Sequence, residues 1–121
     1  MNCETPCPKY ENAVRVLGEK WTCLILRCLL AGLRRFNEIS GYIGRLSDRL
    51  LSRRIQELEE EDIAQRWVLD RRPVVVEYSL APKGSDFRKV AEAIQDWGRR
   101  MGSRAHQRLT LAENKFTAAP N

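Results

Sequence analysis

The sequence has few of the residues on which enzymes and metal proteins depend. Among its 121 residues there is one histidine, His106, and none of the four cysteines forms a C-x-x-C pair with another. A glycine-rich phosphate loop and a pair of converging carboxylates are also missing. We therefore expect a protein that is not an enzyme and that holds no cofactor or metal. The cysteines leave a thiol enzyme as an alternative, which would require turnover with a thiol reductant.

Long apolar runs are absent as well. No segment reaches the length of a membrane span, and the first eight residues lack the basic region and the apolar stretch of a signal peptide. These absences predict a cytoplasmic protein that binds no membrane. In that compartment the cysteines are reduced by default.

What the sequence does contain is arginine, and enough apolar residues for one modest core. Hydrophobic residues make up 43% of the chain, which suits a single domain that completes its burial by dimerising. The formal net charge is +5, and most of the cations are arginines. Arginine favours planar, bidentate contacts with phosphate or guanine, so the charge indicates a polyanionic partner.

Helical and strand-like patterns follow one another in a definite order. We expect an irregular arm over residues 1–8, a folded domain over 9–109 and a frayed tail over 110–121. Within the domain the patterns predict helices over 9–17, 21–31, 36–43, 47–61 and 85–109, and strands over 64–69 and 74–80. This order predicts a mainly α fold with a small β-hairpin wing, a winged helix-turn-helix. The alternative is an α+β domain with no nucleic-acid role.

The helix that begins near Ser47 has the composition of a DNA-reading helix. Its outer face carries Arg49, Ser52, Arg53 and Gln56, while Leu50, Leu51, Ile55 and Leu58 face the core. Arginine can pair with guanine, glutamine with adenine, and serine with a base edge or a phosphate. Further basic residues surround this helix and occupy the hairpin tip. We expect DNA contacts from Arg35, Ser47, Arg49, Ser52, Arg53, Arg54, Gln56, Arg71 and Arg72. A solvated helix with ion pairs is the alternative reading.

Several motifs, taken in order, resemble the HxlR family of MarR-like regulators. They are Cys7-Pro8, Gly18-Glu19-Lys20-Trp21, Arg34-Arg35-Phe36-Asn37-Glu38-Ile39, Leu58-Glu59-Glu60, Val76-Glu77-Tyr78-Ser79-Leu80, Pro82, Gly84 and Trp97. The resemblance implies a winged-helix homodimer, usually a repressor, that binds double-stranded DNA at a pseudo-palindromic operator. It also implies a dimer interface built from the first and last helices, and a sensing cysteine at Cys7. The family usually has glycine where this chain has Asp62, so we expect local backbone strain there.

The four cysteines fall into two groups. Cys23 and Cys28 lie on an apolar helix, about 7.5 Å apart along its axis, which is too far for a disulfide bond. We expect both to fill the core, with Cys28 the more accessible because it borders Arg27. Cys7 precedes Pro8 at a helix N-terminus, where the helix dipole and Lys9 favour the reactive thiolate. It is the candidate redox or electrophile sensor, and Cys3 is a candidate resolving thiol. An inert cysteine in a flexible arm is the alternative.

The last helix carries an apolar stripe that a small domain cannot easily cover alone. Together with the first helix it predicts a dimer seam formed by Tyr10, Val14, Leu17, Phe87, Val90, Ile94, Trp97 and Met101. Packing within one chain is the alternative. The sequence thus predicts a dimeric DNA-binding regulator that responds to thiol chemistry at Cys7. Two alternatives remain. One is a regulator of the same fold that senses a small apolar ligand at the dimer interface, and the other is a winged helix that binds protein and not DNA.

Overall fold

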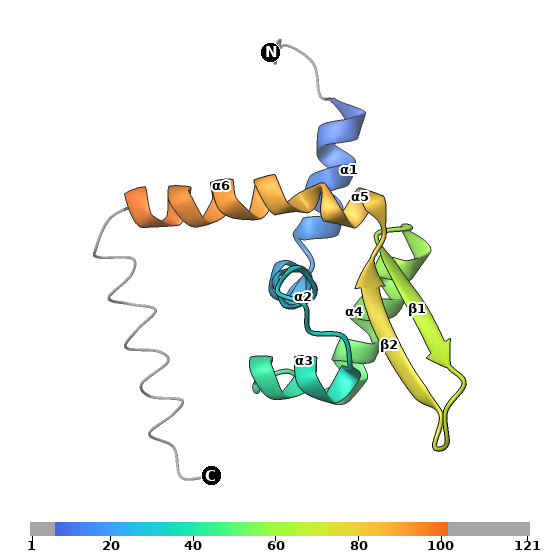
Figure 1. Ribbon diagram of the computed structural model, residues 1–121. Coiled ribbons are helices and arrows are strands. Elements are labelled where there is room, and N and C mark those ends of the chain that lie inside the picture. The colour runs from blue at the N-terminus through green and yellow to red at the C-terminus, as the bar shows by residue number, and fades with distance from the viewer. Residues whose placement is uncertain (1–6, 102–121) are drawn as a thin grey trace, which may run out of the picture. The chain divides into compact units, whose positions relative to one another are not determined.

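The computed structural model describes residues 7–101 (Figure 1). Its elements are α1 (Pro8–Leu17), α2 (Thr22–Leu30), α3 (Phe36–Ile43), α4 (Asp48–Glu60), β1 (Ala64–Leu69), β2 (Val75–Leu80), α5 (Pro82–Ser85) and α6 (Phe87–Arg100). The predicted boundaries hold to within one or two residues up to the end of β2. Instead of one helix from residue 85, a short α5 precedes α6. The arm residues 1–6 with Cys3, the tail from residue 110, and the expected helix beyond residue 101 lie outside the described residues.

The chain divides into two compact units, one up to Arg88 and the other from Lys89 onward. The first unit contains the core, which is centred on α2 as its apolar composition predicts. Ile25, Leu26 and Cys28 of that helix are each at most 1% exposed. Thr22 is the buried polar residue at the start of the same helix. The first unit alone therefore carries a complete, if small, hydrophobic core.

In the two helices that follow α2, side chains accept hydrogen bonds from backbone N–H groups at the N-terminus. At α3, the carboxylate of Glu38 accepts hydrogen bonds from the backbone N–H groups of Arg34 (3.2 Å) and Arg35 (2.9 Å). These bonds to the ionised form lower the pKa of Glu38. At α4, the hydroxyl of Ser47 accepts from the N–H of Leu50 at 3.2 Å, which confirms Ser47 as the predicted N-cap.

The end of α4 turns sharply into the wing. Asp62 has a φ of +59°, and the N–H of Ile63 donates back to the carbonyl of Leu58 at 2.9 Å. Asp62 thus occupies the left-handed conformation for which glycine is the usual residue, as its place in the sequence predicts. Aspartate tolerates this region better than most side chains, because its short polar group can bond locally.

The wing is a two-stranded antiparallel hairpin. Ala64 pairs with Leu80, Arg66 with Tyr78, and Val68 with Val76. The N–H of Tyr78 also donates to the carbonyl of Arg34 at 2.7 Å, so the segment before α3 docks on the outer edge of β2. Figure 1 shows α3, α4 and the projecting hairpin in succession. This is a winged helix-turn-helix. No helix within residues 7–101 is long and apolar enough to cross a membrane.

Candidate nucleic-acid interface and thiol site

The outer face of α4 is fully available for contact. Arg49, Ser52, Arg53 and Gln56 are all exposed, whereas Leu51, Ile55 and Leu58 on the opposite side are at most 1% exposed. Within residues 7–101, neither Arg49 nor Arg53 forms an ion pair. The amphipathic pattern of the sequence therefore gave the orientation of this helix correctly, and its outward donors are free to meet base edges or phosphates.

Arg54 departs from the predicted interface set. Its side chain is 12% exposed and turns away from the outer face. The guanidinium contacts the carboxylates of Glu57 (2.7 Å) and Glu19 (3.3 Å), and its Nε donates to the carbonyl of Lys20 at 3.0 Å. The correction has a physical reason: Arg54 lies on the flank of α4 beside the turn between α1 and α2, where three acceptors converge. Arg54 therefore joins that turn to α4 and is not an outward-facing DNA donor.

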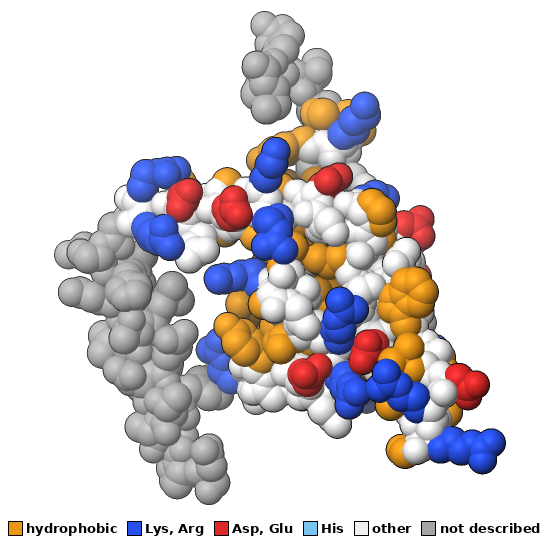
Figure 2. Space-filling view, in the orientation of Figure 1, with side chains coloured by type: hydrophobic (Ala, Val, Ile, Leu, Met, Phe, Trp, Pro, Cys, Tyr) orange, Lys and Arg blue, Asp and Glu red, His pale blue; other side chains and the backbone are white. Residues whose placement is uncertain are grey.

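The remaining basic residues of the predicted set are exposed. Arg71 and Arg72 lie in the hairpin turn, and Figure 2 shows basic side chains at the tip of the wing, at the lower right. Arg35 is partly engaged, since its Nε is 3.7 Å from Glu77 and its side chain is 50% exposed. An exposed pair at this distance is weak and can exchange for a phosphate. Arg66 on β1 is also exposed. Its place in the strand that leads to the hairpin tip is the sequence signal that could have added it to the basic residues of the wing.

The three described cysteines are free thiols with different surroundings. Cys28 is 1% exposed, and burial raises its pKa more than the neighbouring Arg27 lowers it. Cys23 is half-buried, with its Sγ 3.6 Å from the carbonyl of Leu17, and burial raises its pKa as well. The prediction that Cys28 is the more accessible of the two is wrong, because Arg27 points outward while its neighbour faces the core.

Cys7 is exposed and forms the N-cap of α1, with Pro8 at the first helical position. Its carbonyl accepts the first helical hydrogen bond, from the N–H of Glu11 at 2.9 Å. None of the described residues Pro8–Leu17 of α1 is buried. The helix that carries Cys7 is thus attached to the rest of the first unit by few side chains. Cys3 lies outside the described residues.

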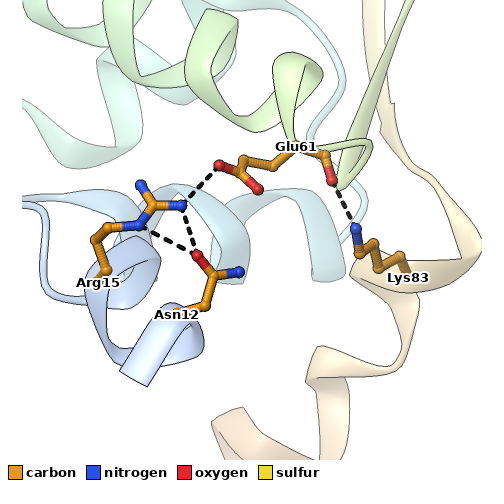
Figure 3. Close-up of polar contacts among 4 residues, drawn as sticks. All are labelled: Asn12, Arg15, Glu61 and Lys83. Carbon is orange, nitrogen blue, oxygen red and sulfur yellow. Dashed lines mark hydrogen bonds and ion pairs between the residues drawn. The ribbon is translucent and has the colours of Figure 1, made fainter. Parts of the chain in front are cut away.

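One of those attachments is a polar junction at Glu61 (Figure 3). Arg15 of α1 pairs with the Glu61 carboxylate at 3.0 Å, and Asn12 accepts from the same guanidinium at 2.7 Å. The Glu61 carbonyl accepts from the ammonium of Lys83 on α5 at 3.0 Å. Glu61 is the C-cap of α4, so α1 and α5 both contact the end of this helix. Residues 15 and 61 are too distant in the sequence for any periodicity to reveal this contact.

The predicted dimer residues are mostly uncovered. Tyr10 (63% exposed) and Val14 (50%) on α1 are open to solvent, whereas Leu17 is half-buried. In the second unit, α6 exposes Val90, Ile94 and Trp97, and Met101 directly after the helix is exposed as well. Phe87 is different, because it belongs to the first unit and is 8% exposed. Phe87 is a core residue of its own chain, and the expectation that it lines the seam is corrected accordingly.

A further cluster escaped the sequence reasoning. Trp21, the N-cap of α2, has a φ of +79°, and two cations lie over its ring. The ammonium of Lys20 is 5.2 Å and the guanidinium of Arg45 is 5.5 Å from the ring centroid. The contact of Arg45 with Trp21 joins the turn before α4 to the turn before α2, where Lys20 also lies. The sequence shows all three residues, but the approach of two turns 25 positions apart follows only from the fold.

The sequence profile of the HxlR-like helix-turn-helix family matches residues 16–106. The chain belongs to this family. HxlR-like relatives from Bacillus subtilis (strain 168) include the HTH-type transcriptional regulators YvaP and YodB. YvaP is 41% identical over 97 residues, covering 80% of this chain and 90% of YvaP. YodB is 41% identical over 93 residues, covering 77% of this chain and 83% of YodB.

Solved structures of other regulators have the same fold. The reduced form of YodB from B. subtilis has a TM-score of 0.71 and 40% identity, covering 77% of this chain and 91% of that one. The redox regulator HypR in its oxidized form has a TM-score of 0.71 and 31% identity, covering 78% of this chain and 96% of that one. YodB has also been solved bound to quinone and after treatment with diamide. The chain is thus a winged helix-turn-helix transcriptional regulator.

Proposed function

We propose that this regulator is a homodimeric repressor that binds a pseudo-palindromic operator. We also propose that Cys7 makes its affinity for DNA respond to oxidants or electrophiles. The observation that carries the DNA-reading part is the exposed face of Arg49, Ser52, Arg53 and Gln56 on α4. These side chains have the donors and acceptors that read base edges in the major groove. Arg71 and Arg72 on the wing are placed to contact phosphate or an adjacent minor groove.

The apolar surfaces on α1 and α6 support a homodimer. Val90, Ile94 and Trp97 are exposed on one amphipathic helix, which is costly in water unless a partner covers it. A two-fold dimer presents two copies of α4. Their half-sites in DNA should then lie about one helical turn, or a multiple of it, apart.

The thiol response is proposed from the contrast between Cys7 and the other described cysteines. Cys7 is exposed on a helix with little burial, while burial raises the pKa values of Cys23 and Cys28 and so disfavours their thiolates at neutral pH. YodB, a relative, binds quinone and has been solved after diamide treatment. Because α1 contacts the end of α4 through Arg15 and Glu61, a reaction at Cys7 has a direct route to the recognition helix.

The chemistry requires two thiols or one thiol and an electrophile. Diamide takes two electrons and two protons from two thiols, which form one disulfide while diamide becomes the hydrazine. Cys7 of the partner subunit, or Cys3, can supply the second thiol. A quinone instead reacts with one thiolate: the sulfur adds to a ring carbon, a C–S bond forms, and the ring takes up a proton and becomes a hydroquinone that caps the thiol. Either product would favour one arrangement of the two recognition helices, and a coupling of about 1–3 kcal/mol suffices for regulation.

The test is operator binding before and after diamide. The operator is first selected from genomic fragments of the parent organism, and affinities are then measured for the wild type, Cys7→Ser, Cys23→Ser and Cys28→Ser. We expect Cys7→Ser to bind like the reduced wild type and to lose the diamide response, while the other two variants keep it. A Cys7→Ser protein that responds to diamide as the wild type does would refute the role of Cys7. That result would not bear on the proposal that the protein binds operator DNA.

A further inference from the structure

Lys20 and Arg45 each place a positive charge against the indole ring of Trp21. Lys20 lies in the turn between α1 and α2, and Arg45 lies in the turn between α3 and α4. Their charged groups are 5.2 Å and 5.5 Å from the centroid of Trp21, and both residues are exposed. Within residues 7–101, the Lys20 ammonium forms no ion pair. Two exposed cations held at one aromatic side chain form a local positive charge that attracts anions.

Both cations are fixed relative to α4. Arg54 of α4 donates to the Lys20 carbonyl at 3.0 Å and pairs with the neighbouring Glu19 at 3.3 Å. Arg45 precedes the N-cap Ser47 by two residues, so the same turn that starts α4 positions its guanidinium. The inward position of Arg54 thus has a role of its own, because it holds Lys20 beside the recognition helix.

The indole ring contributes order as well as attraction. A cation over the face of tryptophan is stabilised by the ring, and its long side chain is then partly immobilised before any partner arrives. Binding consequently costs less side-chain entropy than it would for two freely moving cations. The cluster offers hydrogen-bond donors and positive charge, which suit the oxygens of a phosphate.

We propose that Lys20 and Arg45, ordered by Trp21, bind phosphates of the DNA backbone beside the groove in which α4 lies. This inference rests on the proposed DNA-binding function and extends the interface to a turn outside the helix-turn-helix and the wing. DNA is the occupant because Arg45 lies in the turn that leads into α4, whose exposed outer face carries Arg49 and Arg53. The site contributes affinity that does not depend on sequence, while the face of α4 supplies discrimination.

The experiment measures DNA affinity against salt concentration for Lys20→Gln, Arg45→Gln, and two matched controls. Lys89→Gln and Arg100→Gln remove the same charges from exposed positions on α6, where the structure gives neither side chain a partner among the described residues. Each phosphate contact contributes about 0.9 to the slope of log affinity against log salt concentration. The loss of one contact should therefore reduce affinity about eightfold more at 0.1 M salt than at 1 M salt. Lys20→Arg should retain the wild-type slope. Circular dichroism establishes that each variant is folded.

The expected result is a slope reduced by about one for Lys20→Gln and for Arg45→Gln, equally on the operator and on mixed-sequence DNA. If both variants match Lys89→Gln and Arg100→Gln while the wild type binds DNA, the cluster is not a phosphate site and an acidic protein partner becomes the better occupant. If the ratio of operator to mixed-sequence affinity changes, the contact reads bases and the phosphate assignment is overturned. A wild type without salt-dependent DNA binding would overturn the proposed function, and this inference with it.

Discussion

Arg54 and Arg53 are adjacent in the sequence, yet their side chains have different surroundings in the structure, and substitution by methionine separates the roles that we propose for them. Arg54→Met keeps most of the aliphatic stem while removing the guanidinium that is 12% exposed and contacts Lys20, Glu19 and Glu57. Arg53→Met removes an exposed guanidinium that forms no ion pair within residues 7–101. We expect the first change to lower the free energy of unfolding and the second to lower affinity for the operator.

The size of the stability loss follows from the three contacts of Arg54. The hydrogen bond from its charged Nε to the Lys20 carbonyl contributes the larger part, about 1.5 kcal/mol. Glu19 and Glu57 are 51% and 39% exposed, so water screens both pairs and together they add about 0.5 kcal/mol. The total of about 2 kcal/mol corresponds to a fall in Tm of roughly 8 °C for a chain of this size. Arg53→Met should change stability by less than about 0.5 kcal/mol.

The assay is thermal and urea unfolding of the two variants and the wild type at the same protomer concentration, because dimer formation makes stability depend on concentration. Operator affinity of the same samples gives the second readout. Equal stability of Arg54→Met and Arg53→Met would refute the assignment of Arg54 as the link between α4 and the preceding turn. A large loss of operator affinity in a fully stable Arg54→Met protein would return Arg54 to the DNA interface.

Two further predictions concern the dimer and α3. Ile94→Glu places a charge on the exposed apolar stripe of α6, so it should yield monomers that bind the operator poorly; sedimentation at low concentration checks this, and a stable dimer would show that the seam lies elsewhere. Glu38→Gln removes a carboxylate whose pKa is lowered by hydrogen bonds from Arg34 and Arg35. The ionised carboxylate stabilises the fold above its unfolded-state pKa, and this effect is lost as pH falls through the lowered folded-state pKa. The variant should therefore be less stable than the wild type at pH 7, and the difference should shrink as the pH falls into the acid range. A stability difference that does not shrink in acid would contradict that cap.

Local sequence patterns predict most of the helices and strands of this fold. Ser47 as an N-cap, the leucine and isoleucine spacing of α4, and the β-branched alternation of β2 each specify one element and its boundary. The orientation of the α4 outer face follows from the same spacing. Asp62 could be placed in a left-handed turn because the resemblance showed which residue usually stands there.

The features that could not be predicted depend on contacts between distant segments. Arg54 lies on the flank of α4, and only the approach of the turn at Lys20 decides that it faces inward. Cys28 and Cys23 share one helix, and the accessible one depends on which neighbours cover each side. Phe87 carries the same apolar signal as Ile94, but it falls before the division between the two units and packs into the first. The junction of Arg15 with Glu61 is likewise a tertiary contact without a local signature.

The central claim is that the exposed face of α4 reads the operator sequence. The most direct test is the affinity of Arg53→Ala and Arg72→Ala for the operator and for mixed-sequence DNA at one salt concentration. Arg53→Ala should cost about 1–3 kcal/mol on the operator and much less on mixed DNA, while Arg72→Ala on the wing should weaken both about equally. An equal loss on both DNAs for Arg53→Ala would mean that this residue contacts phosphate only, and would contradict the assignment of α4 as the base-reading helix.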